Sequence, residues 1–208
     1  MSIKYKDENG NLVDLAGMPQ QTSFTIDFSN STITSINELL QKLANDVYPK
    51  TLMQLIPDMT SNTTPYGSAS ANYVYSGRYA YYGMRHSVAP SIYDGTSLHY
   101  MNSHGNYLQY DFENLSIINK ITFKGSVGDT PTSDGKSYYG IYYLDKENNL
   151  IELDNQCYFV NKMSGDYFTD VEYDITIPIT AKAIRIVNNN VNNFAVAQLQ
   201  AYGSIVNN

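Results

Sequence analysis

The sequence predicts an all-β protein, an antiparallel β-sandwich or jelly roll preceded by a small region with one β-hairpin and one helix. Its aromatic residues are mostly tyrosine, with 20 Tyr, 7 Phe and no Trp, and tyrosine favours strands. From residue 59 onward, short segments with alternating apolar and polar side chains are separated by turns rich in Gly, Asn, Asp and Ser. About 150 residues suffice for one such core.

Residues 1–58 are expected to form a small attachment or oligomerisation region. Residues 3–15 alternate around ENGN (8–11), whose Asn-Gly pair is typical of a tight hairpin turn. Residues 23–28 read as a strand, and Pro49 and Pro57 bound a short linker. Between this strand and Pro49, apolar residues at three-to-four spacing predict a helix within 31–47. They are Ile33, Ile36, Leu39, Leu40, Leu43 and Val47. This helix is expected either to pack on neighbouring elements or to self-associate through Ile36, Leu39 and Leu43, which would make a homo-oligomer.

Residues 59–208 are expected to form the sandwich domain. No helical period persists there, and the strand-like segments are short and follow one another at the spacing of an antiparallel sandwich. The expected strands are residues 107–112, 117–125, 138–144, 157–161, 173–177, 183–188 and 195–203.

Composition and motifs argue for a binding protein rather than an enzyme. The net charge of −7 and pI near 4.8 disfavour nucleic acid and anionic membranes as partners. Cys157 is the single cysteine and sits in a strand-like run, as a small buried apolar residue would. No G-x-S-x-G, H-E-x-x-H, Walker or dinucleotide motif occurs. The N-terminus lacks the apolar stretch of a signal peptide.

Several short motifs, taken in order, resemble the discoidin domain, the coagulation-factor type C module with a galactose-binding-like jelly roll. After TSNTTPYG (60–67) come IYDG (92–95), YLQYDF (107–112), IRI (184–186) and VAQLQAYG (196–203). They match the family's "T-S-N-x-x-P-x-G", "A-F-D-G", "W-x-x-Y-D-F", "V-R-L" and "V-A-E-I-x-L-Y-G" segments. The resemblance covers residues 59–203, and Tyr107 stands where the family typically has Trp.

The resemblance implies a structural calcium ion at the IYDG turn. Calcium takes six or more oxygens, which a carboxylate, a hydroxyl and backbone carbonyls can supply. Asp94 and Thr96 fit these roles, and the position of the family's last-strand Glu is Gln198. The alternative is an ordinary Asx turn capped by Asp94.

The loops are the expected carbohydrate site, because a sandwich presents its contact groups on loops. Tyrosine faces suit the apolar side of a sugar ring, and Arg, His and Asn can bond its hydroxyls. The alternative is that alternating tyrosines form one face of a strand. The predicted ligand-binding residues are Tyr79, Tyr81, Tyr82, Arg85, His86, Asn102, His104 and Asn189.

IKYKDENGNLVDLAGM (3–18) resembles the openings of phage tail, fibre and baseplate proteins. This resemblance implies a virion protein, made in the host cytoplasm without a signal peptide and acting outside cells. We therefore expect a virion-associated receptor-binding protein whose jelly roll binds host cell-surface glycan and whose first region contacts other virion proteins. The alternative is a structural or decoration protein whose jelly roll makes only protein contacts.

Overall fold

A computed structural model describes residues 4–6, 12–14, 26–28, 31–33, 52–126, 134–160, 167–190 and 193–206. The chain divides into two compact units, Met1–Thr51 and Leu52–Asn208. The second unit therefore begins earlier than residue 59, because Leu55 and Ile56 are buried in its core. Within the described residues, no helix is long and apolar enough to cross a membrane.

The first unit contains two small antiparallel hairpins. Strand β1 (Lys4–Lys6) pairs with β2 (Leu12–Asp14), which confirms the pairing expected around ENGN. Strand β3 (Ile26–Phe28) pairs with β4 (Ser31–Ile33). The predicted helix thus loses its first residues to β4, where β-branched Thr32 and Ile33 suit a strand. The rest of that helix lies outside the described residues.

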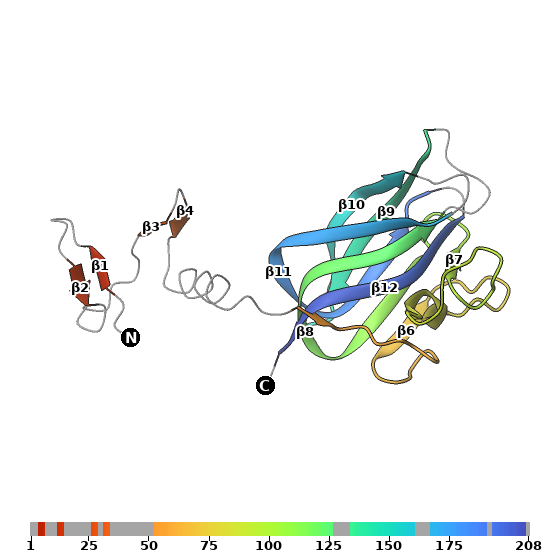
Figure 1. Ribbon diagram of the computed structural model, residues 1–208, viewed down its shortest axis with the longest axis horizontal. Helices are drawn as coiled ribbons and strands as arrows, with labels where there is room; N and C mark the ends of the chain where they lie inside the picture. The colour runs from red at the N-terminus through yellow and green to blue at the C-terminus, as the bar shows by residue number, and fades with distance from the viewer. Residues whose placement is uncertain are drawn as a thin grey trace. The chain divides into compact units, whose positions relative to one another are not determined.

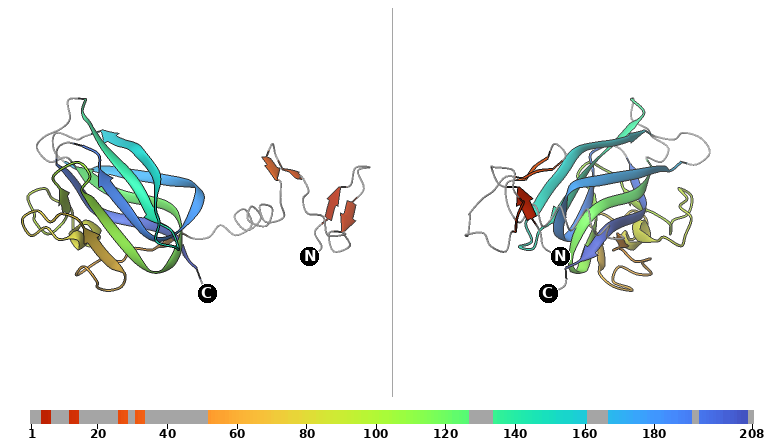
Figure 2. Two further views of the ribbon diagram at one scale, coloured as in Figure 1. Left: turned by 180° about the vertical axis from the view of Figure 1, so that it is seen from behind. Right: turned by 60° about the vertical axis from the view of Figure 1, so that its left-hand side comes forward.

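The second unit is an antiparallel β-sandwich (Figures 1 and 2), as the sequence predicts. Its main sheet runs in the order β10-β9-β11-β8-β12-β5, with β6 on β8 and β7 on β12. The strands are β5 (Met53–Gln54), β6 (Ser68–Ala71), β7 (His99–Met101), β8 (Tyr107–Ser126), β9 (Lys136–Leu144), β10 (Leu150–Val160), β11 (Thr169–Asn188) and β12 (Phe194–Ile205).

Two 20-residue strands, β8 and β11, run through both layers of the sandwich. The start of β8 pairs with β6 and with the end of β11, which also pairs with β9. The end of β8 pairs with β12 and with the start of β11. Register shifts after Asp174 and Ala181 mark the bend in β11. The segments expected as separate strands at 107–112 and 117–125, and at 173–177 and 183–188, are therefore continuous.

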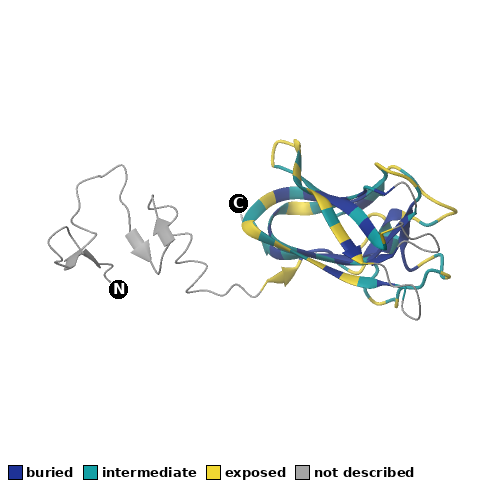
Figure 3. Ribbon diagram, turned by 90° about the horizontal axis from the view of Figure 1, so that it is seen from above, coloured by how far each residue is buried: buried dark blue, intermediate teal, exposed yellow. Residues whose placement is uncertain are grey.

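The core lies between the layers, and buried residues alternate with exposed ones along the strands (Figure 3). An aromatic cluster joins the layers: the Phe123 ring centroid on β8 lies 5.2 Å from that of Tyr139 on β9 and 6.3 Å from that of Phe194 on β12. Such aromatic pairs add about 0.5–1.5 kcal/mol each beyond the burial of their area. The register places Met101, Ser126, Val160 and Asn188 at one end of the sandwich.

Candidate functional site

The segment between β6 and β7 carries most of the exposed tyrosines. It turns at Ser76 and Gly77, both with positive φ, and then forms the 3-10 helix η2 (Ala80–Met84). Ala80, Gly83 and Met84 of η2 are buried, so the neighbouring tyrosines are held at the surface. We call the following set the tyrosine surface: Tyr73, Tyr75, Tyr79, Tyr81, Tyr82 and Tyr93, with Arg78 and Arg85.

Tyr79, Tyr81 and Tyr82 form one aromatic group. Tyr79 is 49% exposed, and its ring stacks on that of Tyr81 with centroids 6.2 Å apart and 12° between the planes. The centroids of Tyr81 and Tyr82 lie 4.4 Å apart. A hydrogen bond between the Tyr81 and Tyr82 side chains, together with burial, raises the pKa of Tyr81. The sequence prediction that these three act together is consistent with this grouping.

A second group surrounds Arg78. Its guanidinium carbon lies 5.1 Å from the ring centroid of Tyr100, within cation–π range. The ring of Tyr75 lies 5.7 Å from that of Tyr100 and 6.5 Å from that of Tyr73. Tyr75 is 45% exposed and packs against the buried Tyr100. This group therefore offers the exposed part of the Tyr75 ring to a ligand.

The two arginines of the tyrosine surface hold the turn at residues 91–97 by hydrogen bonds to its backbone. Arg78 Nη2 donates to the carbonyl oxygen of Ile92 (3.2 Å), and Arg85 Nη1 donates to that of Thr96 (3.0 Å). A guanidinium has five N–H donors, and among the described residues these are the hydrogen bonds that the two side chains make. Each arginine therefore keeps donors for a ligand while it supports the turn that carries Tyr93.

His99 lies buried beneath the tyrosine surface and contacts the backbone of Arg78. It is fully buried at the start of β7, and its Nδ1 lies 3.2 Å from the carbonyl oxygen of Arg78. Its Nε2 is buried without a partner in the described part of the chain. Burial lowers the pKa of His99 to about 4, so the imidazole is neutral and donates from Nδ1 at neutral pH.

We expect this histidine to make the fold acid-sensitive. In the unfolded chain its pKa is 6.5, so between pH 6.5 and 4 the unfolded state binds more protons than the folded state. Stability then falls as the pH falls through that window, by on the order of 3 kcal/mol at most. Urea unfolding at pH 7, 5.5 and 4.5 measures the slope. His99→Asn keeps a donor but cannot titrate, so it should flatten the slope; an unchanged slope would assign the acid sensitivity to other groups.

The remaining predicted ligand residues lie elsewhere. His86 faces β12: its Nε2 lies 2.9 Å from the carbonyl oxygen of Leu199. Asn102 and His104 are in the β7–β8 turn, where His104 is exposed. Asn189 donates to the carbonyl oxygen of Asn155 (2.7 Å) and so supports the sheet edge. The structure brings Tyr79, Tyr81, Tyr82 and Arg85 together and leaves these four outside that group.

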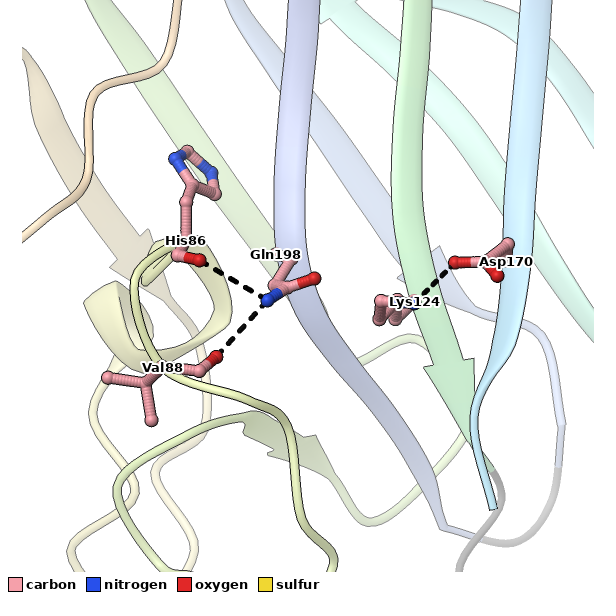
Figure 4. Close-up of polar contacts among 5 residues, drawn as sticks. All are labelled: His86, Val88, Lys124, Asp170 and Gln198. Atoms are coloured by element: carbon pink, nitrogen blue, oxygen red, sulfur yellow. Dashed lines mark hydrogen bonds and ion pairs between the residues drawn. The ribbon is translucent and has the colours of Figure 1, made fainter. Parts of the chain in front are cut away.

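The residues predicted to hold calcium do not fit that ion as they are arranged. Asp94 Oδ1 accepts hydrogen bonds from N and Oγ1 of Thr96 (2.9 and 2.8 Å), which is the Asx turn. These bonds and the charge of Arg85 lower the pKa of Asp94. Gln198 turns its amide nitrogen to the carbonyl oxygens of His86 and Val88, at 3.4 and 3.1 Å (Figure 4). Only the NH₂ group can donate to carbonyls, so Gln198 does not direct its oxygen towards them.

Whether this turn binds calcium can be tested directly. We expect EDTA to leave the melting temperature of the full chain unchanged, because hydrogen bonds already satisfy the Asp94 turn and the Gln198 amide. Differential scanning fluorimetry with EDTA and with excess Ca²⁺ measures this. A drop of several degrees in EDTA that Asp94→Ala removes would instead establish the ion. Among the described residues, no group of three or more His, Cys, Asp or Glu side chains converges.

Four members of the tyrosine surface were not among the predicted ligand-binding residues: Tyr73, Tyr75, Arg78 and Tyr93. Tyr93 is 78% exposed, and its ring lies 6.2 Å from that of Tyr167, perpendicular to it. The sequence signal that could have identified Tyr93 was its position directly before Asp94, in a segment expected to form a turn. Tyr107, where the resembled family has Trp, carries the Arg185 guanidinium 3.9 Å from its ring centroid. That side chain is thus already occupied by a contact within the sheet.

Comparison with known proteins supports the fold. No family model and no curated protein matches the chain, but solved structures do. The lectin domain of lectinolysin complexed with Lewis B antigen is 18% identical, with a TM-score of 0.50, covering 70% of this chain and 98% of that one. A Streptococcus pneumoniae fucose binding module is 10% identical, with a TM-score of 0.51 and coverage of 76% and 99%.

The family 32 carbohydrate-binding module of C. perfringens NanJ in complex with galactose is 12% identical, with a TM-score of 0.48 and coverage of 65% and 93%. At such low sequence identities, structural similarity shows a shared fold and nothing more. The fold assignment rests on the lectin domain and the fucose binding module. The second unit of this chain therefore has the galactose-binding-like β-sandwich fold that lectin and carbohydrate-binding modules share.

Proposed function

We propose that this protein is a carbohydrate-binding module, without catalytic activity, that recognises a glycan through the tyrosine surface. The observation that carries the proposal is the gathering of exposed tyrosines around two arginines on one segment between β6 and β7. Tyrosine rings stack on the apolar face of a sugar, and guanidinium N–H groups donate to its hydroxyls. The shared fold with a lectin domain and a fucose binding module supports the proposal.

The chemistry of the surface favours a neutral glycan bound weakly per site. The chain carries a net charge of −7, which disfavours a polyanionic ligand. A shallow site with a few rings and donors needs repeated copies, and multivalent display raises avidity by about 10²–10⁴. Presentation in several copies is therefore part of the proposed function.

A glycan array tests the proposal. The full chain, biotinylated and displayed on streptavidin, should bind a subset of neutral glycans saturably, and the matching free sugar should compete. If the folded multivalent protein binds no glycan, the sandwich serves protein contacts instead, as in a decoration protein.

We also propose that the protein acts on a phage virion, with its first unit attached to other virion proteins. The support is the resemblance of residues 3–18 to phage tail openings, together with the pairing of β1 and β2 there. An antibody against the chain should label the tails of purified particles in electron micrographs. Label that stays with the unassembled protein fraction would remove the virion from the proposal.

A further inference from the structure

A second concave site lies on the outer face of one layer, over β12, β8 and β11. It encloses about 460 Å³, within the roughly 300–1,000 Å³ of small-molecule sites. Its lining differs entirely from the tyrosine surface, since no residue belongs to both. We call it the sheet groove; Figure 4 shows part of it, with Gln198 on β12 beside Lys124 on β8 and Asp170 on β11.

The floor of the sheet groove is a ladder of outward-facing polar residues. On β8, Ile121 and Phe123 point into the core, so Lys120, Thr122 and Lys124 point out. Lys120 Nζ lies 2.7 Å from Glu172, and Lys124 Nζ lies 2.5 Å from Asp170. The lysine side chains are 26% and 29% exposed and their partners 65% and 73%, so the acids form the rim and the lysines lie along the floor.

The wall opposite β11 is fixed by an interlocked set of side chains. The His86 ring lies 2.9 Å from the carbonyl oxygen of Leu199 through Nε2 and 3.2 Å from Gln54 Nε2 through Nδ1. Buried Gln200 accepts from the backbone N–H of Ile56 (2.9 Å) and donates to its carbonyl (2.8 Å). This wall exists before any ligand arrives, which limits the entropy lost on binding.

Several polar groups in the sheet groove have no hydrogen-bond partner among the described residues. They are the hydroxyl of Thr122, the hydroxyl of Tyr202 and the side-chain oxygen of Gln198, whose nitrogen is used as described above. Thr122 pairs with Gln200 across the strands, and Tyr202 pairs with Lys120. The open groups therefore lie in the middle of the floor, between the ion pairs and the wall.

The balance of charge identifies the class of ligand. Two lysines are matched by two acids, so the sheet groove attracts neither a polyanion nor a polycation. An ammonium beside a carboxylate offers donors and acceptors side by side. The hydroxyl and amide groups between them add both kinds, and Tyr202 and Leu52 supply apolar surface. A neutral polyhydroxyl ring matches this mixture.

We propose that the sheet groove is a second carbohydrate-binding site, which takes one or two rings of a neutral saccharide across β12, β8 and β11. With the tyrosine surface it would make each copy of the chain bivalent. The groove stands on its own residues, so either site can exist without the other.

Chemical-shift mapping tests the groove. The ¹⁵N-labelled full chain is titrated with lactose, cellobiose, chitobiose and maltose, one at a time. We expect at least one to shift the amide signals of Thr122, Lys124 and Gln200 in a saturable way. Shifts confined to residues 73–96 would support the tyrosine surface and overturn the groove. No shift with any of the four disaccharides would also overturn it.

Two variants make the assignment sharper. Thr122→Gln fills the middle of the floor without reaching the core, and should weaken binding at the groove about tenfold or more, the cost of one or two hydrogen bonds. Thr180→Gln on β11 is the matched control, since Thr180 is exposed and does not line the groove; its affinity should equal that of the wild type. Asp170→Asn, at an exposed rim position, should weaken binding with no change in melting temperature. If both groove variants bind as the wild type does, the groove is not a ligand site.

Discussion

Replacing Tyr75, Tyr79 and Tyr93 together with alanine is expected to abolish glycan binding by the multivalent protein while its melting temperature stays within a few degrees. These rings are 45%, 49% and 78% exposed, so truncation opens no cavity and surface changes of this kind usually cost little stability. Each ring contact with a sugar contributes on the order of 1 kcal/mol, so three lost contacts weaken each site about a hundredfold. The glycan array and scanning calorimetry measure the two effects.

The choice of residues separates binding from packing. Tyr81 packs partly against the hydrophobic core, so its truncation would change stability as well as binding. Tyr158→Ala is the matched control, because Tyr158 is 51% exposed but stands on β10. It should bind glycan as the wild type does. Equal losses in the control and the triple variant, or a triple variant that binds normally, would remove the tyrosine surface as the site.

Gly203→Ala is expected to destabilise the fold by several kcal/mol, the largest effect of any change considered for this chain. A Cβ at Gly203 would lie 1.8 Å from the carbonyl oxygen of Ile117 and 3.2 Å from the Cα of Ile118. Both are backbone atoms of β8, which is paired on both sides and cannot move aside without breaking its ladder. Overpacking of this kind is one of the few mechanisms that cost more than about 4 kcal/mol. Urea unfolding measures the free energy.

Gly95→Ala is the comparison that isolates the clash. A Cβ there would meet only the Arg78 Nε, at 4.0 Å, and its φ is not positive. The same substitution should therefore leave stability unchanged or raise it by about 0.4–1 kcal/mol through the unfolded state. If Gly203→Ala unfolds at the same urea concentration as Gly95→Ala, then β8 and β12 do not approach each other as closely as the structure shows.

Local patterns predicted the strands well, because the alternation of apolar and polar residues that indicates a strand lies within each segment. Residues 195–203 and 138–144 became β12 and β9 with small changes at their ends. The joining of 107–112 with 117–125 was not predictable, because Glu113 and Asn114 resemble a turn. In the structure, β8 pairs with β11 on both sides of this polar stretch, at Asp111 and at Ser116, and so continues through it. Tertiary pairing thus overrides local preference there.

The candidate sites were predictable only where their residues are neighbours in sequence. Tyr79, Tyr81, Tyr82 and Arg85 lie on the short helix η2 or directly beside it, so their clustering followed from spacing. The sheet groove joins Thr122, Asp170 and Gln198, which are far apart in the chain. Alternation shows that each faces outward, but no pattern within one strand indicates which strand lies beside it. The same limit hid the contact between Arg78 and Ile92.

The two hydrogen bonds between the Gln200 side chain and the Ile56 backbone affect how the sandwich resists a mechanical force. Leu52 leads into β5, and β5 pairs with β12 through only two residues, Met53 and Gln54. Tension from the chain before Leu52, acting against a glycan held at the loops, would peel these pairs first. The next bonds to take the load are the one from the Leu55 N–H to the carbonyl oxygen of Ala201 (2.8 Å) and the two between Gln200 and Ile56, which are buried and act together. A buried side chain on the last strand thus adds to the force needed to separate residues 52–56 from the sandwich.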